Sequence, residues 1–153
     1  MIDSPDQTDA LAVLTSDHVA ILECFNKFLN SETRSEQLAN DVFEALEVHA
    51  KMELDVFYPE VETIAPITAE VNAARVEHAE IQRQINAMRQ RLADKANIDD
   101  QMGELLARVR AHFIEEERTL FPAARVTLGA ALWDITPALQ ACKNEAAGAG
   151  GVG

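Results

Sequence analysis

The chain has 153 residues, of which 48% are apolar, and a formal net charge of −13. This length fits one domain with a sizeable core, and the apolar content excludes a disordered chain. The negative charge argues against nucleic acid and anionic membrane surfaces as partners, because both would be repelled.

Targeting and disulfide signals are missing from the sequence. The two cysteines, Cys24 and Cys142, lie far apart and form no CxxC motif, so no disulfide framework is indicated. The N-terminal stretch MIDSPDQTDALAVL lacks the basic region of a secretory signal, and no apolar run is long enough to span a bilayer. We therefore expect a cytoplasmic protein.

Apolar residues recur at spacings of three and four in four segments, which predicts four amphipathic helices. In chain order these helices are expected over residues 16–30, 35–58, 66–92 and 99–120.

The ends of these helices carry recognisable signals. Ser16 is a plausible N-cap for the first helix, with a short helical lead-in over 8–14. Pro66 suits the first helical position of the third helix. Pro59 and Pro122 are expected to end the second and fourth helices, because a residue before proline is pushed out of the α region.

Four long helices with short connections predict an all-α fold, an antiparallel up-down four-helix bundle. A weaker pattern over 129–146 adds a short C-terminal helical segment, which Trp133 is expected to pack onto the bundle. We expect a single domain over residues 1–145. Residues 146–153, rich in glycine and alanine, are expected to form a flexible tail.

Each long helix carries one histidine, and each histidine falls on the apolar stripe. These residues are His18, His49, His78 and His112. If about a third of helix positions face inward, random placement would put all four inside about once in eighty tries. A single histidine on such a stripe is more often a satisfied core residue than a ligand, so the argument depends on all four together.

Two glutamates sharpen the pattern. Glu53 follows His49 by four residues, and Glu116 follows His112 by four, so each pair lies on one helical face. A single pair of this kind is commonly a surface pair. Imidazole and carboxylate ligands together suit a cation such as iron or manganese.

The chain also nearly repeats itself. His18 and His78 are 60 residues apart, each after an acidic residue, and His49 and His112 are 63 apart. The pseudo-duplicate predicts four histidines and two carboxylates around a common centre, with two metal ions bridged by the glutamates. Burying these six groups without a metal would cost on the order of several kcal/mol.

This order of motifs resembles the hemerythrin-like, or HHE cation-binding, domains over residues from about 8 to 125. The stretches that carry the resemblance are SDHVAI (16–21), HAKMELDVFYP (49–59), EHAEI (77–81) and HFIEEERTLFP (112–122). The family implies a four-helix bundle that holds two non-haem iron ions, carboxylate- and oxo-bridged. By that resemblance the metal ligands are His18, His49, Glu53, His78, His112 and Glu116. Zinc or manganese would fit the same ligand types, since selectivity depends on geometry and supply.

The sequence departs from oxygen-carrying hemerythrins at two positions. Those proteins have a fifth histidine where this chain has Ala74, and they place the second carboxylate where this chain has Glu117. We favour Glu116, because the internal repeat matches it to Glu53. With six protein ligands the two ions keep open positions, so reversible oxygen carriage is less favoured than redox chemistry with oxygen, peroxide or nitric oxide.

Two further residues have open interpretations. Tyr58 is the only tyrosine, and its repeat partner is Phe121. Both are hydrophobic plugs at a helix end in the more common interpretation; in the other, the Tyr58 hydroxyl reaches the metal pocket as a ligand or hydrogen-bond partner. Glu77 faces solvent or a neighbouring helix, or supports a metal-binding histidine.

The leading function is a non-haem di-iron protein that binds or senses a small ligand, such as oxygen or nitric oxide, or iron itself. The alternative is a di-iron oxidoreductase acting on peroxide or oxygen, and the sequence leaves open whether the chain is an enzyme. A metal-free bundle used for interactions ranks third. The sequence names no protein partner, so a regulatory role would need a separate one.

Overall fold

The computed structural model describes residues 9–64 and 67–151, and within these ranges it is helical without a strand. The elements are α1 (Ala10–Leu29), α2 (Glu36–Met52), η2 (Glu53–Phe57), α3 (Tyr58–Ile64), α4 (Thr68–Ala93), α5 (Asp99–Glu115), η3 (Glu116–Leu120), α6 (Phe121–Leu128) and α7 (Ala131–Gly151). The predicted all-α bundle is therefore confirmed.

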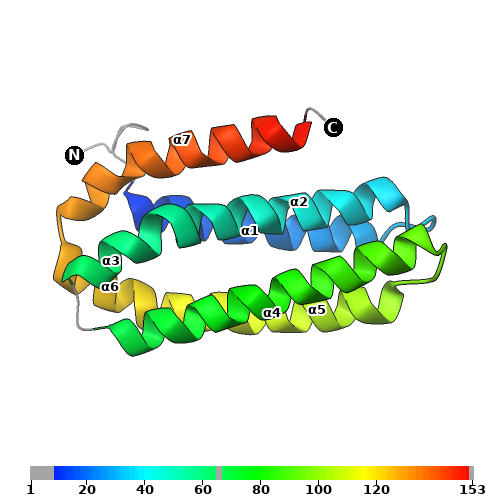
Figure 1. Ribbon diagram of the computed structural model, residues 1–153, viewed down its shortest axis with the longest axis horizontal. Coiled ribbons are helices and arrows are strands. Elements are labelled where there is room, and N and C mark those ends of the chain that lie inside the picture. Colours follow the sequence, from blue (N-terminus) through cyan, green and yellow to red (C-terminus); the bar gives the residue numbers. More distant parts are fainter. Residues whose placement is uncertain (1–8, 65–66, 152–153) are drawn as a thin grey trace.

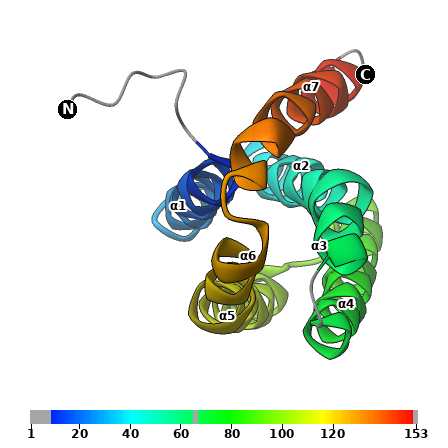
Figure 2. The ribbon, with the colours of Figure 1, turned by 90° about the vertical axis from the view of Figure 1, so that its left-hand side faces the viewer.

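The helices form two antiparallel pairs and an outer helix (Figure 1). In the end-on view α1, α2 with α3, α4, and α5 with α6 occupy the corners of the bundle, and α7 lies outside it (Figure 2). The α7 helix packs on α1 and α2. The α4–α5 pair therefore forms the side of the bundle away from α7.

The first helix begins earlier than predicted. Asp9 is the N-cap of α1, and its Oδ1 accepts a hydrogen bond of 2.9 Å from the backbone N–H of Ala12. Ser16 lies inside α1, so its expected role as N-cap is wrong. Aspartate caps as well as serine does, and the lead-in residues continue the helix without a break. Ser35 caps α2 by accepting from the N–H of Leu38 at 3.1 Å. Pro66 lies outside the described residues, and α4 begins at Thr68.

The second and fourth helices do not end at their prolines. Each passes through a π-helical turn, in which the N–H of Tyr58 bonds to the carbonyl of Glu53 and that of Phe121 to Glu116. A proline in a regular α-helix clashes with the carbonyl four residues earlier. The wider turn re-registers the backbone just before Pro59 and Pro122, so each helix continues as α3 or α6.

The C-terminal helical segment is not short, as the sequence predicted, but forms the 21-residue helix α7. Leu132, Ile135 and Leu139 are its buried apolar residues, whereas Trp133 is 45% exposed and is not the packing residue expected. Helix α7 includes residues 146–151 of the segment that the sequence predicts to be a flexible tail; alanine is a strong helix former.

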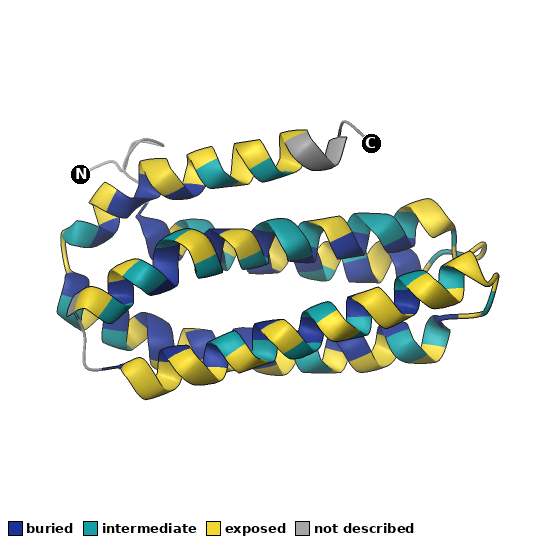
Figure 3. Ribbon diagram, in the orientation of Figure 1, coloured by how far each residue is buried: buried dark blue, intermediate teal, exposed yellow. Residues whose placement is uncertain are grey.

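The apolar core consists of two clusters, separated along the bundle by the layer of histidines. One cluster includes Leu14, Met52 and Phe57 together with buried residues of α6 and α7. The other, which includes Phe25 and Phe43, fills the opposite end. Buried faces turn inward on every helix of the bundle, while the outer faces are exposed (Figure 3). None of the described helices has the length and apolarity needed to cross a membrane.

Candidate metal centre

The six residues predicted as ligands come together in the middle of the bundle. They are His18 of α1, His49 of α2, Glu53 of η2, His78 of α4, His112 of α5 and Glu116 of η3. None of these side chains is more than 6% exposed. A buried polar layer of this kind is costly unless its members are paired or bind a cation.

These residues form two overlapping groups of four that share both glutamates. The first position comprises His18, His49, Glu53 and Glu116, and the second comprises Glu53, His78, His112 and Glu116. Within each group the potential ligand atoms lie within 4.8 Å of one another. Both glutamates are therefore placed to bridge the two positions.

The inward-facing nitrogen is Nε2 in every histidine. At the first position, Nε2 of His18 lies 3.3 Å from Oε1 of Glu116, and Nε2 of His49 lies 3.2 Å from Oε1 of Glu53. At the second position, Nε2 of His78 lies 2.9 Å from Oε1 of Glu53, and Nε2 of His112 lies 3.4 Å from Oε1 of Glu116.

Five of the converging atoms are fully buried and have no hydrogen-bond partner. They are Nε2 of His18, His49 and His112, Oε2 of Glu53 and Oε1 of Glu116. An unsatisfied buried polar group costs about 1–3 kcal/mol. A cation at each position would satisfy all five atoms, so the residues present fit a pair of metal ions.

The outer nitrogens at the first position are held by carboxylates. Oδ2 of Asp17 lies 2.7 Å from Nδ1 of His49, and Oε2 of Glu117 lies 2.7 Å from Nδ1 of His18. The Lys143 ammonium on α7 donates to Oδ1 of Asp17 at 3.0 Å. A histidine that donates from Nδ1 presents the lone pair of Nε2, which is the tautomer that a metal needs.

The second position lacks this support. Over residues 9–64 and 67–151, no group hydrogen-bonds to Nδ1 of His78 or His112. Glu77 precedes His78 as Asp17 precedes His18, but both Glu77 oxygens accept from Arg108 at 2.9 Å. The two halves of the centre are thus unequal, which the sequence repeat did not predict.

The hydroxyl of Tyr58 reaches into the cluster. It donates to Oε2 of Glu116 at 2.6 Å and lies 3.0 Å from Nε2 of His78 and 3.3 Å from Oε1 of Glu53. The Tyr58 ring is buried in the apolar cluster, so both sequence interpretations hold for different parts of the side chain. Its repeat partner Phe121 has no polar atom in its side chain and stacks on His18, with the ring centroids 5.8 Å apart.

The two glutamates differ electrostatically. Burial and the neighbouring charge of Glu53 raise the pKa of Glu116 well above its usual range. Burial opposes ionisation of Glu53 too, but the charge of His49 and the nearby polar groups of Glu116 and His112 outweigh it and hold the pKa of Glu53 well below its usual range. Two carboxylates that share a site cannot both ionise easily, so without metal they share a proton.

The pKa values of the two histidines at the first position are shifted in opposite directions. Burial lowers the pKa of His18 to about 4. Burial would lower the pKa of His49 as well, but Glu53 and Asp17 outweigh it and raise the value to about 9. Without metal, His49 thus keeps a proton at neutral pH and Glu116 favours its protonated form, and a cation could replace these protons.

Bundles that carry inward histidines and glutamates on facing helices form a class of cation-binding proteins. The hemerythrin HHE cation-binding domain model matches residues 9–127, and the chain belongs to this family. That span contains all six converging residues and ends before α7. No functionally curated protein matches the chain significantly.

A similar solved structure is that of a hemerythrin HHE cation-binding domain-containing protein from Mycobacterium kansasii. The TM-score is 0.80 at 23% sequence identity, covering 93% of this chain and 89% of that one. At this identity the likeness shows that the two proteins share a fold.

Proposed function

We propose that this protein binds two iron ions, with His18, His49, Glu53, His78, His112 and Glu116 as ligands. The main support is that two buried four-residue groups share both glutamates, so the same two carboxylates can bind both ions. The unpartnered atoms of the same residues support the proposal, because two cations would satisfy them. The two apolar clusters beside the layer would strengthen these bonds by lowering the local dielectric constant.

Iron is favoured by the mixed imidazole and carboxylate ligands. Bound iron would supply a redox-active centre with room for an external ligand, since six protein residues cannot saturate two six-coordinate ions. Zinc or manganese would use the same residues. Anaerobic reconstitution with each metal, followed by metal analysis and absorption spectroscopy, separates these cases.

The leading function is the binding or sensing of a small molecule such as oxygen or nitric oxide, or of iron itself. The chain holds a hydrogen-bond donor at the second position, the Tyr58 hydroxyl, which can stabilise an oxygen or nitrogen atom bound there. A reversible spectral change with nitric oxide or oxygen, without turnover, is the expected result. Absence of any spectral change on adding either gas would contradict it.

The alternative is an oxidoreductase that consumes peroxide or oxygen. Tyr58 favours it, because a buried hydroxyl in contact with Glu116 can pass a proton at the centre. Disproportionation of two peroxide molecules to two waters and dioxygen needs no further reactant. Catalytic consumption of peroxide by the wild type would establish the enzyme, if the His112→Ala variant loses both this activity and the absorption bands.

A further inference from the structure

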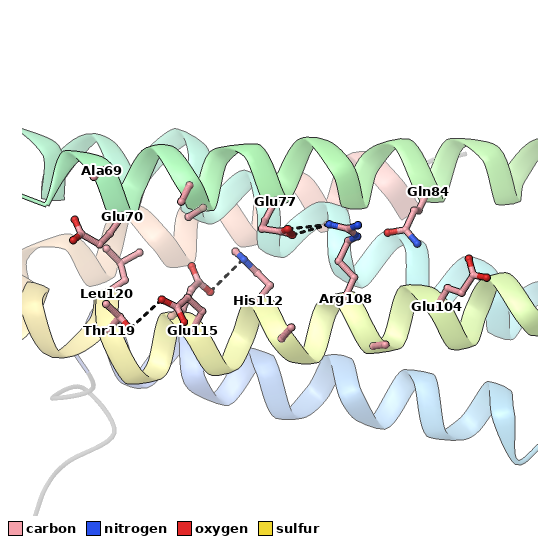
Figure 4. Close-up of a pocket in the computed structure, with 15 residues that line it drawn as sticks. Ala69, Glu70, Glu77, Gln84, Glu104, Arg108, His112, Glu115, Thr119 and Leu120 are labelled. Carbon is pink, nitrogen blue, oxygen red and sulfur yellow. Dashed lines mark hydrogen bonds and ion pairs between the residues drawn. The ribbon is translucent and has the colours of Figure 1, made fainter.

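A groove lies between α4 and α5 (Figure 4). These two helices are on the side of the bundle away from α7 (Figure 1). Its volume is about 830 Å³. Small side chains form much of its wall, with Ala69, Ala73 and Ala74 on α4 facing Ala107 and Ala111 on α5. The polar residues among these alanines decide what the groove can bind.

The groove opens onto the second position and not the first. His112 and Glu116 line it, although they are only 4% and 2% exposed. Both carry a buried atom without a hydrogen-bond partner, Nε2 of His112 and Oε1 of Glu116. Neither His18 nor His49 is among the lining residues. His78 does not line the groove either, so a ligand that travels along the groove reaches the second position from its His112 side.

The internal repeat shows what closes the other face. Ala73 and Ala74 correspond to Val13 and Leu14, 60 residues earlier, and Ala111 corresponds to Val48, 63 residues earlier. Leu14 is fully buried, and Val13 and Val48 pack against the apolar cluster that includes the buried leucines of α7. Larger side chains and helix α7 thus fill the α1–α2 face at the place that corresponds to the α4–α5 groove.

Charge determines what the groove would admit. Besides Glu116, four glutamates line it: Glu70, Glu77, Glu104 and Glu115. The one cationic side chain, Arg108, is already paired with both oxygens of Glu77. Anions would be repelled by the remaining carboxylates, whereas an uncharged molecule would not. The volume far exceeds that of a diatomic molecule, so the groove selects by charge more than by fit.

We propose that the α4–α5 groove is the entry and binding site for a small uncharged ligand, which reaches the centre at the second position, held by His78 and His112. On the α1–α2 face, the larger side chains and α7 cover the first position, held by His18 and His49. This inference rests on the proposed metal centre, because the unpartnered atoms at the groove floor are metal ligands in that proposal.

The test measures association of nitric oxide with the reduced, iron-loaded protein by stopped-flow absorption. Ala107→Leu and Ala111→Leu narrow the groove, and both positions are exposed, so the variants should fold. Ala87→Leu, exposed on α4 but outside the groove, is the matched control. We expect the double variant Ala107→Leu/Ala111→Leu to slow association at least about tenfold with unchanged iron content, and Ala87→Leu to match the wild type.

A second arm tests the charge selectivity with azide as an anionic probe. Exchange of Glu70, Glu104 and Glu115 for glutamine should speed azide association at least about threefold at low ionic strength and leave the nitric oxide rate unchanged. An unchanged azide rate would overturn the charge argument.

The outcomes separate the inference from the function on which it rests. Equal nitric oxide rates in the wild type, the double leucine variant and the control would contradict the role of the groove. If these proteins still bound two irons, the proposed metal centre would stand. A wild-type protein that retains no iron would overturn both.

Discussion

The hydroxyl of Tyr58 donates a 2.6 Å hydrogen bond to Oε2 of Glu116, joining the two halves of the internal repeat through the centre. Tyr58 follows Glu53 by five residues, and Phe121 follows Glu116 by five, so the two aromatic residues occupy equivalent places. Only Tyr58 has a polar atom to offer. The centre is therefore unsymmetric, and the second position has a hydrogen-bond donor that the first lacks.

Tyr58→Phe should preserve the fold and iron binding but change the behaviour of the centre. Without metal, Glu116 loses its buried donor, and the free energy of unfolding should fall by about 1–3 kcal/mol. With iron, the absorption bands should shift and the affinity for nitric oxide should decrease. Denaturant unfolding and ligand titration measure the two effects, and an unchanged iron spectrum and affinity would remove Tyr58 from the site.

Two adjacent glutamates should behave differently when each is changed to glutamine. Glu116 belongs to both four-residue groups and is buried, so Glu116→Gln should lose the stoichiometric binding of two ions. Glu117 is 43% exposed and contacts only the outer nitrogen of His18, so Glu117→Gln should keep two ions and bind them about 10–100-fold more weakly. Competition with a chelator measures both affinities. The reverse order of effects would make Glu117 the bridging residue.

Asp17 and Lys143 should support the first position with unequal strength. Asp17 holds Nδ1 of His49 directly, so Asp17→Asn should weaken metal binding about 10–100-fold. Lys143 acts only through Asp17 and is 45% exposed, so Lys143→Met should have an effect of less than about tenfold. Lys51→Met removes a comparable ammonium, paired with Asp55 away from the centre, and is the control. An effect of Lys143→Met equal to that of Lys51→Met would show that α7 does not influence the metal.

Metal binding should release protons. The folded pKa of His49, about 9, lies above its ordinary value of 6.5, so its protonation stabilises the metal-free fold fully below pH 6.5 and is lost as pH rises through 9. At pH 7 a metal must displace this proton, and the raised pKa of Glu116 adds another. The apparent affinity should therefore rise at least about tenfold from pH 7 to pH 8. Calorimetry in buffers of different ionisation enthalpy counts the protons, and a pH-independent affinity would contradict the prediction.

The sequence predicts the convergence of the six residues well where helical spacing decides the geometry. Four histidines on apolar stripes and a glutamate one turn after two of them must converge once the helices pack, and they do. Spacing alone does not reveal partners that come from elsewhere in the chain. Asp17 and Glu77 occupy the same place in the repeat, yet Glu77 is paired with Arg108. The repeat counterpart of Arg108 is Ala45, which has no charge.

The main errors concern where helices begin and end. The prolines at 59 and 122 would end ordinary α-helices, but the π-helical turns that start at Glu53 and Glu116 let both helices continue. Local sequence rules assume α-helical bonding and do not anticipate such a turn. Helix α7 also continues through a proline, Pro137, and is longer than the short segment that the sequence predicts.

The most direct test of the metal centre is the iron content of the protein after anaerobic reconstitution, measured together with its near-ultraviolet absorption. We expect two irons per chain with charge-transfer bands of an oxo-bridged pair, and loss of both in the His112→Ala variant. A chain that binds fewer than one iron under these conditions, or a His112→Ala variant that keeps two irons and the same bands, would contradict it.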